Sequence, residues 1–172
     1  MPLHPALTPG RAAVITGAAS GIGLAVAEKL AALGMKVCLS DIDGAALQLA
    51  AATVSKTART AGNVIVVPAD VSKAQDVERL KDSAYAAFGE VAFLMNNAGI
   101  GGSGGTIFGA PDQWRRILDV NLWGVINGVQ AFAPAMLAQG TDCAIVNTGS
   151  KQGITCPPGE TAYNVSKAGM KV

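Results

Sequence analysis

The sequence contains a single histidine and few charged or aromatic residues. His4 lies in a Pro-containing segment near the N-terminus, so a Ser-His-Asp or Cys-His hydrolase would need its only imidazole there. We therefore do not expect a hydrolase of that kind. Charged residues make up 15% of the chain, the net charge is +1 and no basic run is present, so we expect no binding to nucleic acid.

Cysteine is also scarce. The three cysteines, Cys38, Cys143 and Cys156, are odd in number and are not spaced as Cys-x-x-Cys. This pattern argues against a zinc site and against a disulfide framework. It fits a reducing compartment, so we expect a cytoplasmic protein that holds no metal.

One long segment carries no charge, which raises the question of a membrane span. Residues 120–141 are uncharged, but they include Asn121, Asn127 and Gln130 as well as Pro134, and charged segments flank them closely. We therefore predict a helix buried in the core or in a subunit contact, and no membrane association.

Glycine and apolar residues, in contrast, are abundant. The 172 residues include 21 glycines, and 50% of the chain is hydrophobic, which is typical of a buried α/β protein with many tight turns. A chain of this length buries about 70% of its unfolded surface in one domain. We find neither an internal repeat nor a linker, and we expect one domain over residues 12–172. Residues 1–11 lack the features of a signal peptide and are expected to form a flexible tail.

Strand-like and helix-like segments alternate along the chain. Short apolar runs predict strands at residues 12–16, 36–40, 63–67, 91–95 and 143–148. Helical spacing predicts helices at residues 21–34, 43–60, 72–88, 112–139 and from 161 onward. Strands separated by helices imply right-handed crossovers and a parallel sheet covered on both faces. The sequence thus predicts a Rossmann-like, doubly wound α/β fold.

Four residues are expected to shape the helix ends or bends. Gly34 should end the first helix, because glycine readily adopts the left-handed conformation there. Asp43 and Ser72 should cap the starts of the second and third helices. Pro134 should bend the long fourth helix.

A glycine-rich turn joins the first predicted strand to the first predicted helix. It reads Thr16-Gly17-Ala18-Ala19-Ser20-Gly21-Ile22-Gly23. Glycines let such a turn close and let backbone N–H groups approach a pyrophosphate at the positive end of the helix. The alternative is an ordinary glycine-rich turn, but the strand before it and the helix after it favour a dinucleotide site.

Asp41 ends the second predicted strand and bears on the choice of cofactor. A carboxylate there can accept hydrogen bonds from both ribose hydroxyls of NAD and repels the 2′-phosphate of NADP. No Lys or Arg occurs in residues 16–23 or 39–48 to bind that phosphate. We therefore predict NAD in preference to NADP. The alternative role of Asp41, as a helix cap, can be filled by Asp43 instead.

Tyr163 and Lys167 lie four residues apart in the last predicted helix, and hence on one face. Across about 6 Å, at an effective dielectric constant of about 20, an ammonium favours a phenolate by roughly 3 kcal/mol. A tyrosine placed in this way can act as a general acid or base near neutral pH. The pair alone is weak evidence, because tyrosine and lysine share helix faces in many proteins.

Taken together, these motifs resemble the short-chain dehydrogenase/reductase family, in its branch of single-domain oxidoreductases. The landmarks follow the family's order over nearly the whole chain. The turn at residues 16–23 is similar to the family's cofactor turn, Asp70-Val71 to its adenine-contacting pair, and Asn96-Asn97-Ala98-Gly99 to the motif after its fourth strand. The positions that match its catalytic tetrad are Asn121, Ser150, Tyr163 and Lys167.

The resemblance implies hydride transfer between NAD(H) and a small-molecule alcohol or ketone, on a sheet of strand order 3-2-1-4-5. Tyr163 would be the general acid/base, Ser150 would hydrogen-bond the substrate oxygen, Lys167 would also bond the nicotinamide ribose, and Asn121 would hold a water through its backbone. The residues implied to bind the cofactor are Thr16, Gly17, Ser20, Gly21, Ile22, Gly23, Asp41, Asp70, Val71, Asn97, Ala98, Gly99, Tyr163 and Lys167.

The main departure from the family is the early end of the chain, at Val172. Family members continue well past the position of Lys167, into further strands, a substrate loop and part of an oligomer interface. The family's strand order would then leave residues 143–148 at an exposed sheet edge, which invites pairing with another chain. We expect a fragment of a longer, homo-oligomeric oxidoreductase. The alternative is a truncated, non-catalytic remnant that binds nucleotide.

Overall fold

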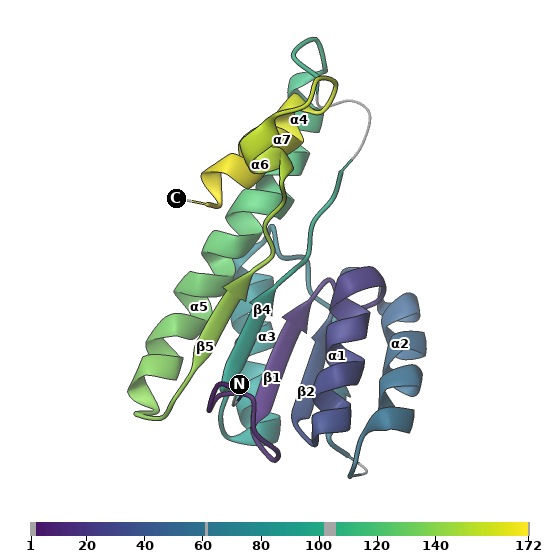
Figure 1. Cartoon of the computed structure of the whole chain (residues 1–172), viewed down its shortest axis with the longest axis vertical. Helices are drawn as coiled ribbons and strands as arrows, with labels where there is room; N and C mark the ends of the chain where they lie inside the picture. The colour runs from purple at the N-terminus through teal and green to yellow at the C-terminus, as the bar shows by residue number, and fades with distance from the viewer. Residues whose placement is uncertain (1–2, 61, 102–105, 172) are drawn as a thin grey trace.

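Five parallel strands form one sheet with helices on both faces (Figure 1). The computed structural model describes residues 3–60, 62–101 and 106–171. The strands are β1 (Ala12–Thr16), β2 (Lys36–Ser40), β3 (Val64–Val66), β4 (Phe93–Asn96) and β5 (Ala144–Asn147). Their order in the sheet is β3-β2-β1-β4-β5, and all four neighbouring pairs are parallel. The predicted fold class and strand order are therefore confirmed.

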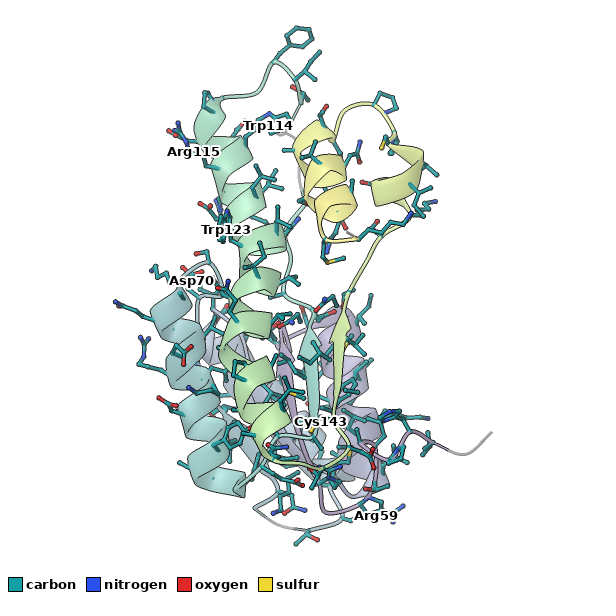
Figure 2. All side chains as sticks on the ribbon, turned by 90° about the vertical axis from the view of Figure 1, so that its left-hand side faces the viewer. Arg59, Asp70, Trp114, Arg115, Trp123 and Cys143 are labelled. Atoms are coloured by element: carbon teal, nitrogen blue, oxygen red, sulfur yellow. The ribbon has the colours of Figure 1, made fainter. Side chains whose placement is uncertain are left out.

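The helices cover the two faces of this sheet. They are α1 (Gly21–Leu33), α2 (Gly44–Thr57), α3 (Ala74–Phe88), α4 (Pro111–Leu118), η1 (Asp119–Trp123), α5 (Gly124–Ala138), α6 (Gln152–Thr155) and α7 (Thr161–Gly169). Helices α1 and α2 pack on one face, while α3 and α5 lie side by side on the other (Figure 2). Helices α4, α6 and α7 stand beyond the carboxyl ends of the strands, above the sheet in Figure 1.

The central strand β1 contributes to the core on both faces. Ile15 packs with the buried residues of α1 and α2, and Val14 packs with those of α3 and α5. Both side chains are fully buried. Because successive side chains of a strand point to opposite faces, a central parallel strand reads as a continuous apolar run.

Two of the predicted helix ends are confirmed, and one is wrong. Gly34 ends α1 with a left-handed φ of 92°, and the Asp43 carboxylate caps α2 by accepting two backbone N–H groups. The N-cap position of α3, however, is Lys73. The Ser72 hydroxyl donates instead to the Asp70 carboxylate, at 2.6 Å. The nearby carboxylate thus takes the hydroxyl that we expected to cap the helix.

The segment predicted as one long helix, residues 112–139, is interrupted by a π-helical turn. This turn, η1, joins α4 to α5 and contains the fully buried Asn121. Pro134, where we expected a bend, lies inside α5. The departure from α-helical geometry that the structure shows is the π-helical turn η1, which precedes α5. π-turns inside α-helices are frequent at functional sites. No helix in the described part of the chain is both long and apolar enough to cross a membrane.

Residues 3–11, which we predicted to be a flexible tail, lie against the domain. Ala6 is fully buried and Leu7 packs against the core on the α1 side of the sheet. The Arg11 guanidinium donates two hydrogen bonds to the Glu90 carboxylate, at 2.8 and 3.2 Å. Apolar contacts and an ion pair therefore hold this segment in place.

Strand β5 lies at one edge of the sheet, as predicted, and Val146 in this strand is 42% exposed.

Candidate active site

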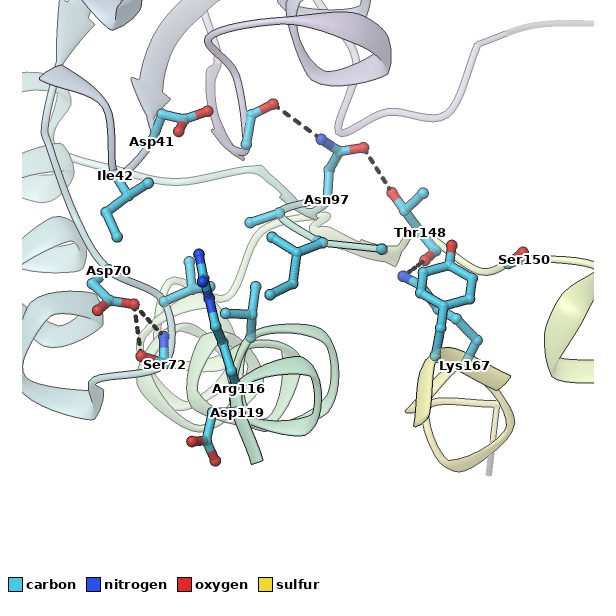
Figure 3. Close-up of a pocket in the computed structure, with 18 of the residues that line it drawn as sticks. Asp41, Ile42, Asp70, Ser72, Asn97, Arg116, Asp119, Thr148, Ser150 and Lys167 are labelled. Atoms are coloured by element: carbon cyan, nitrogen blue, oxygen red, sulfur yellow. Dashed lines mark hydrogen bonds between the residues drawn. The ribbon is translucent and has the colours of Figure 1, made fainter. Parts of the chain in front are cut away.

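A cleft of about 1030 Å³ lies at the carboxyl ends of the strands (Figure 3). The segments that follow β1, β2, β4 and β5 all contribute to its lining. This is where open parallel sheets bind their ligands. The predicted site residues that line it are Gly17, Ser20, Ile22, Asp41, Asp70, Val71, Asn97, Ala98, Gly99, Ser150, Tyr163 and Lys167. The others, Thr16, Gly21, Gly23 and Asn121, are not in the lining.

The glycine turn after β1 is closely packed. Gly17 and Gly21 have φ values of 65° and 55°, a conformation that strains other residues. Gly23 is buried against Gly17, where an added Cβ would lie 2.3 Å from the Gly17 carbonyl oxygen. Ser20 occupies the N-cap position of α1 without a side-chain capping bond. The first N–H groups of α1 therefore lack a side-chain cap, as an anion-binding helix start requires.

Asn97 ties this turn to the segment after β5. Its Nδ2 donates to the carbonyl oxygens of Thr16 and Gly17, at 3.0 and 3.2 Å. Its Oδ1 accepts a hydrogen bond from the Thr148 hydroxyl at 3.2 Å. The Thr16 hydroxyl oxygen accepts the N–H groups of Asn97 and Ala98, at 3.0 and 3.1 Å. Thr16 thus supports the wall of the cleft from behind.

Asp41 is held by backbone N–H groups beside the glycine turn. Its Oδ2 accepts from Ala19 at 3.0 Å, and its Oδ1 accepts from Asp43 at 3.4 Å. The cap of α2 is Asp43, so the alternative role of Asp41 as a helix cap is wrong. The Asp41 carboxylate instead lines the cleft.

Asp70 lies at the same end of the cleft. It accepts hydrogen bonds from the N–H and hydroxyl groups of Ser72, at 3.1 and 2.6 Å, and lies 3.3 Å from the Lys73 ammonium. Burial alone would raise the pKa of Asp70, but the Ser72 bonds and Lys73 outweigh it and lower that pKa below its ordinary value. Asp70 is therefore an anion at neutral pH.

Tyr163 and Lys167 line the other end, from α7. Lys167 Nζ lies 5.8 Å from the centroid of the Tyr163 ring, on the same helix face as the spacing predicts. Lys167 is only 6% exposed, and its ammonium donates to the Thr148 carbonyl oxygen at 2.8 Å (Figure 3). Burial lowers the pKa of Lys167. A buried cation is thus fixed beside the tyrosine ring by the end of β5.

Ser150 lies near this pair in the lining (Figure 3). Its hydroxyl oxygen accepts the N–H of Gln152 at 3.2 Å. Within residues 3–60, 62–101 and 106–171, no hydrogen bond joins Ser150 to Tyr163. Catalytic hydrogen bonds are often completed only when substrate is present, so this separation is compatible with a substrate oxygen between the two hydroxyls.

Asn121 acts from behind the cleft. Its Oδ1 accepts the N–H of Ile100 at 2.7 Å, and its Nδ2 donates to the Ile100 carbonyl at 2.8 Å and to Ser166 Oγ at 3.2 Å. Ser166 Oγ donates in turn to the Tyr163 carbonyl at 2.7 Å. The side chain therefore clamps the segment after β4 to the helix that carries Tyr163. A water on the Asn121 backbone stays a prediction.

Thr148, Ser166 and Arg116 are among the site residues that are absent from our sequence prediction. Thr148 and Ser166 hold Lys167 and Tyr163 as described, and each is a polar residue within two positions of a predicted site residue. This closeness in the sequence to predicted site residues could have indicated them. Arg116 also lines the cleft, one helical turn before Val120 of the same lining, and that spacing was its only signal.

Comparison with known proteins decides the family. The sequence model described as short chain dehydrogenase matches residues 11–172. The chain belongs to the short-chain dehydrogenase family. It is 39% identical over 159 residues to 1-deoxy-11-beta-hydroxypentalenate dehydrogenase of Streptomyces exfoliatus, a match that covers 91% of the chain and 57% of that protein. It is 38% identical over 168 residues to 2-(R)-hydroxypropyl-CoM dehydrogenase of Xanthobacter autotrophicus, covering 93% and 64%.

Solved structures of short-chain dehydrogenases agree with this assignment. A short-chain dehydrogenase/reductase from Burkholderia phymatum in complex with NAD is 44% identical with a TM-score of 0.89, and the match covers 95% of the chain and 57% of that structure. A metagenomic short-chain oxidoreductase in complex with NADP is 32% identical with a TM-score of 0.87, covering 96% and 73%. The chain thus spans little more than half the length of several relatives, and solved members of the family bind either nicotinamide cofactor.

Proposed function

We propose that this chain carries the cofactor cleft and the proton-transfer residues of an oxidoreductase that moves a hydride between NAD(H) and an alcohol or ketone. The observation that carries the proposal is one cleft with the uncapped glycine turn and Asp41 in one part and Tyr163 beside a buried lysine in another. Its volume of about 1030 Å³ suits an extended dinucleotide with a small substrate. When bound, the nicotinamide supplies or accepts the hydride.

The protein must then handle the proton, and Tyr163 is the group placed to do so. Its hydroxyl would give a proton to the oxygen of a ketone, or take one from an alcohol. The Lys167 ammonium, 5.8 Å from the centroid of the Tyr163 ring, would donate to the nicotinamide ribose. Ser150 would donate a hydrogen bond to the same substrate oxygen and hold it near Tyr163. Asn121 and Ser166 position the helix that presents these groups.

For the cofactor we propose NAD in preference to NADP. The Asp41 carboxylate, fixed by two backbone N–H groups, suits the two ribose hydroxyls of NAD and repels a 2′-phosphate. Titration of the chain with NADH and with NADPH measures this preference. Asp41→Ser should narrow the difference between the two dissociation constants, and an unchanged difference would remove Asp41 from the explanation.

The test of the proposed chemistry is Tyr163→Phe, with a panel of secondary alcohols and NAD or of ketones and NADH. We expect turnover to fall by about 100-fold or more, since the general acid/base is lost, while the dissociation constant of NADH stays within about threefold. Tyr85→Phe is the matched control, because Tyr85 bonds to Gln139 and lies outside the cleft lining. Normal turnover in Tyr163→Phe would overturn the assignment.

A second candidate is a nucleotide-binding chain without turnover. It is favoured by the exposed edge of β5, where Val146 is 42% exposed. In that case NADH binds, but neither the chain nor its Tyr163→Phe variant oxidises any alcohol of the panel. The homo-oligomeric state of a longer form stays a prediction, which light scattering on that form would test.

A further inference from the structure

Ile42 and Arg116 project into the end of the cleft where Asp70 lies (Figure 3). Ile42 belongs to the loop after β2, and Arg116 belongs to α4, so two distant segments present one apolar and one cationic side chain to the same space. Ile42 is 71% exposed. A large apolar side chain left open beside a cleft is available to cover a ligand.

The guanidinium of Arg116 has no ion-pair or hydrogen-bond partner among the described residues. Its neighbour Arg115 also lines the cleft, but it is paired with Asp112 at 2.8 Å. Across residues 3–60, 62–101 and 106–171, Arg116 makes neither an ion pair nor a side-chain hydrogen bond. Asp119, one turn further along, points away from it (Figure 3). Arg116 is therefore a cation that faces the cleft and is not neutralised by an ion pair within the described residues.

The proposed function fixes which part of the dinucleotide reaches this end. The glycine turn receives the pyrophosphate, and Tyr163 and Lys167 receive the nicotinamide half. The remaining part of the lining, with Asp41 and Asp70, must then receive the adenosine half.

We propose that Ile42 and Arg116 hold the adenine base between them, with the Arg116 guanidinium stacked on one face of the ring. This inference rests on the proposed function. A planar guanidinium stacks well on an aromatic face, and an aliphatic side chain suits the opposite face. The anionic Asp70 beside them is an acceptor for the exocyclic amine of the base. The same cation could instead bind a 2′-phosphate, but two carboxylates, Asp41 and Asp70, line that end and oppose it.

The test is the affinity of four chains for NADH and for reduced nicotinamide mononucleotide, which lacks the adenosine half, both followed by cofactor fluorescence. Arg116→Ala should raise the dissociation constant of NADH by roughly 2- to 30-fold and leave that of the mononucleotide unchanged. Ile42→Ala should raise it by roughly 2- to 5-fold. Arg59→Ala removes the same charge from an exposed arginine that lies outside the cleft lining and should leave both constants within about twofold. Arg116 and Ile42 are exposed, so these variants should fold, which circular dichroism checks.

The outcomes separate the inference from the function on which it rests. If the wild-type chain does not bind NADH, both fall. If it binds NADH and Arg116→Ala binds it equally well, the stacking is wrong while the function stands. Equal weakening of the mononucleotide would also overturn the stacking. Arg116→Ala that weakens NADPH more than NADH would identify Arg116 as a phosphate ligand and overturn it as well.

Discussion

Alanine at position 23 has no room in this fold. A Cβ there would lie 2.3 Å from the Gly17 carbonyl oxygen and 2.7 Å from Asn97 Nδ2. The Gly17 peptide would have to move by roughly 1 Å to restore van der Waals contact. Because the obstacle is backbone in a closed turn, the neighbour cannot yield by rotating a side chain. Gly23→Ala should therefore disturb both the stability of the domain and the geometry of the glycine turn.

The magnitude follows from two opposed terms. Overpacking of a closely packed site costs about 1–3 kcal/mol, while alanine in place of glycine inside a helix returns about 1 kcal/mol. We expect a net loss of up to about 2 kcal/mol in the free energy of unfolding. Since the N–H groups of the turn also move, the dissociation constant of NADH should rise by about tenfold or more.

Gly44→Ala provides the matched control. Gly44 is also at the start of a helix, α2, but the nearest atom to an added Cβ there is Pro68 Cγ at 3.7 Å, an ordinary contact. This variant should be unchanged or stabilised by up to about 1 kcal/mol, with normal NADH affinity. Urea unfolding followed by circular dichroism, and fluorescence titration with NADH, give the two quantities. If Gly23→Ala matches the wild type in both quantities, Gly23 is not packed closely against Gly17.

Two further predictions concern stability and thiol reactivity. Arg11→Met removes the paired hydrogen bonds to Glu90 and one to the Thr141 hydroxyl, and should lower the free energy of unfolding by about 1–2 kcal/mol. The hydrogen bond from Arg11 lowers the folded-state pKa of Glu90 below its ordinary 4.5, so the stabilisation by this pair is complete above pH 4.5 and is lost as the pH falls through the folded-state pKa. The free energy of unfolding of Arg11→Met should therefore depend less steeply on pH in acid than that of the wild type. The same dependence in both proteins would contradict this. Iodoacetamide at pH 8 should label the exposed Cys156 in the native chain and leave Cys38 unlabelled, because burial raises the Cys38 pKa to about 12. Mass spectrometry reads the sites, and labelled native Cys38 would show that β2 opens.

The sequence predicted the strands best where burial is most complete. Residues 12–16 and 36–40 match β1 and β2 at both ends, because strands buried on both faces leave a continuous apolar run. Asp43 was predictable because a carboxylate capping a helix acts on its own first turn. The role of Ser72 was not predictable, because its hydroxyl could bond either to the first turn of the helix or to the carboxylate of Asp70.

The candidate site likewise has features that the sequence could predict and features that depend on tertiary contacts. The face shared by Tyr163 and Lys167 follows from helical spacing alone, and their common cleft with Asp41 follows from a parallel sheet. The π-turn around Asn121 has no local sequence signal, because it depends on how the helix meets the segment after β4. The Thr148 carbonyl that holds Lys167 is equally a tertiary contact.

The most direct test of the central claim is a crystal structure of this chain with NADH. We predict a dinucleotide along the cleft, with the pyrophosphate at the first turn of α1, the nicotinamide ring beside Tyr163 and Lys167, and the adenine beside Ile42. A cleft without NADH at a concentration that saturates the chain in solution would contradict the claim. So would a dinucleotide bound with its two ends exchanged.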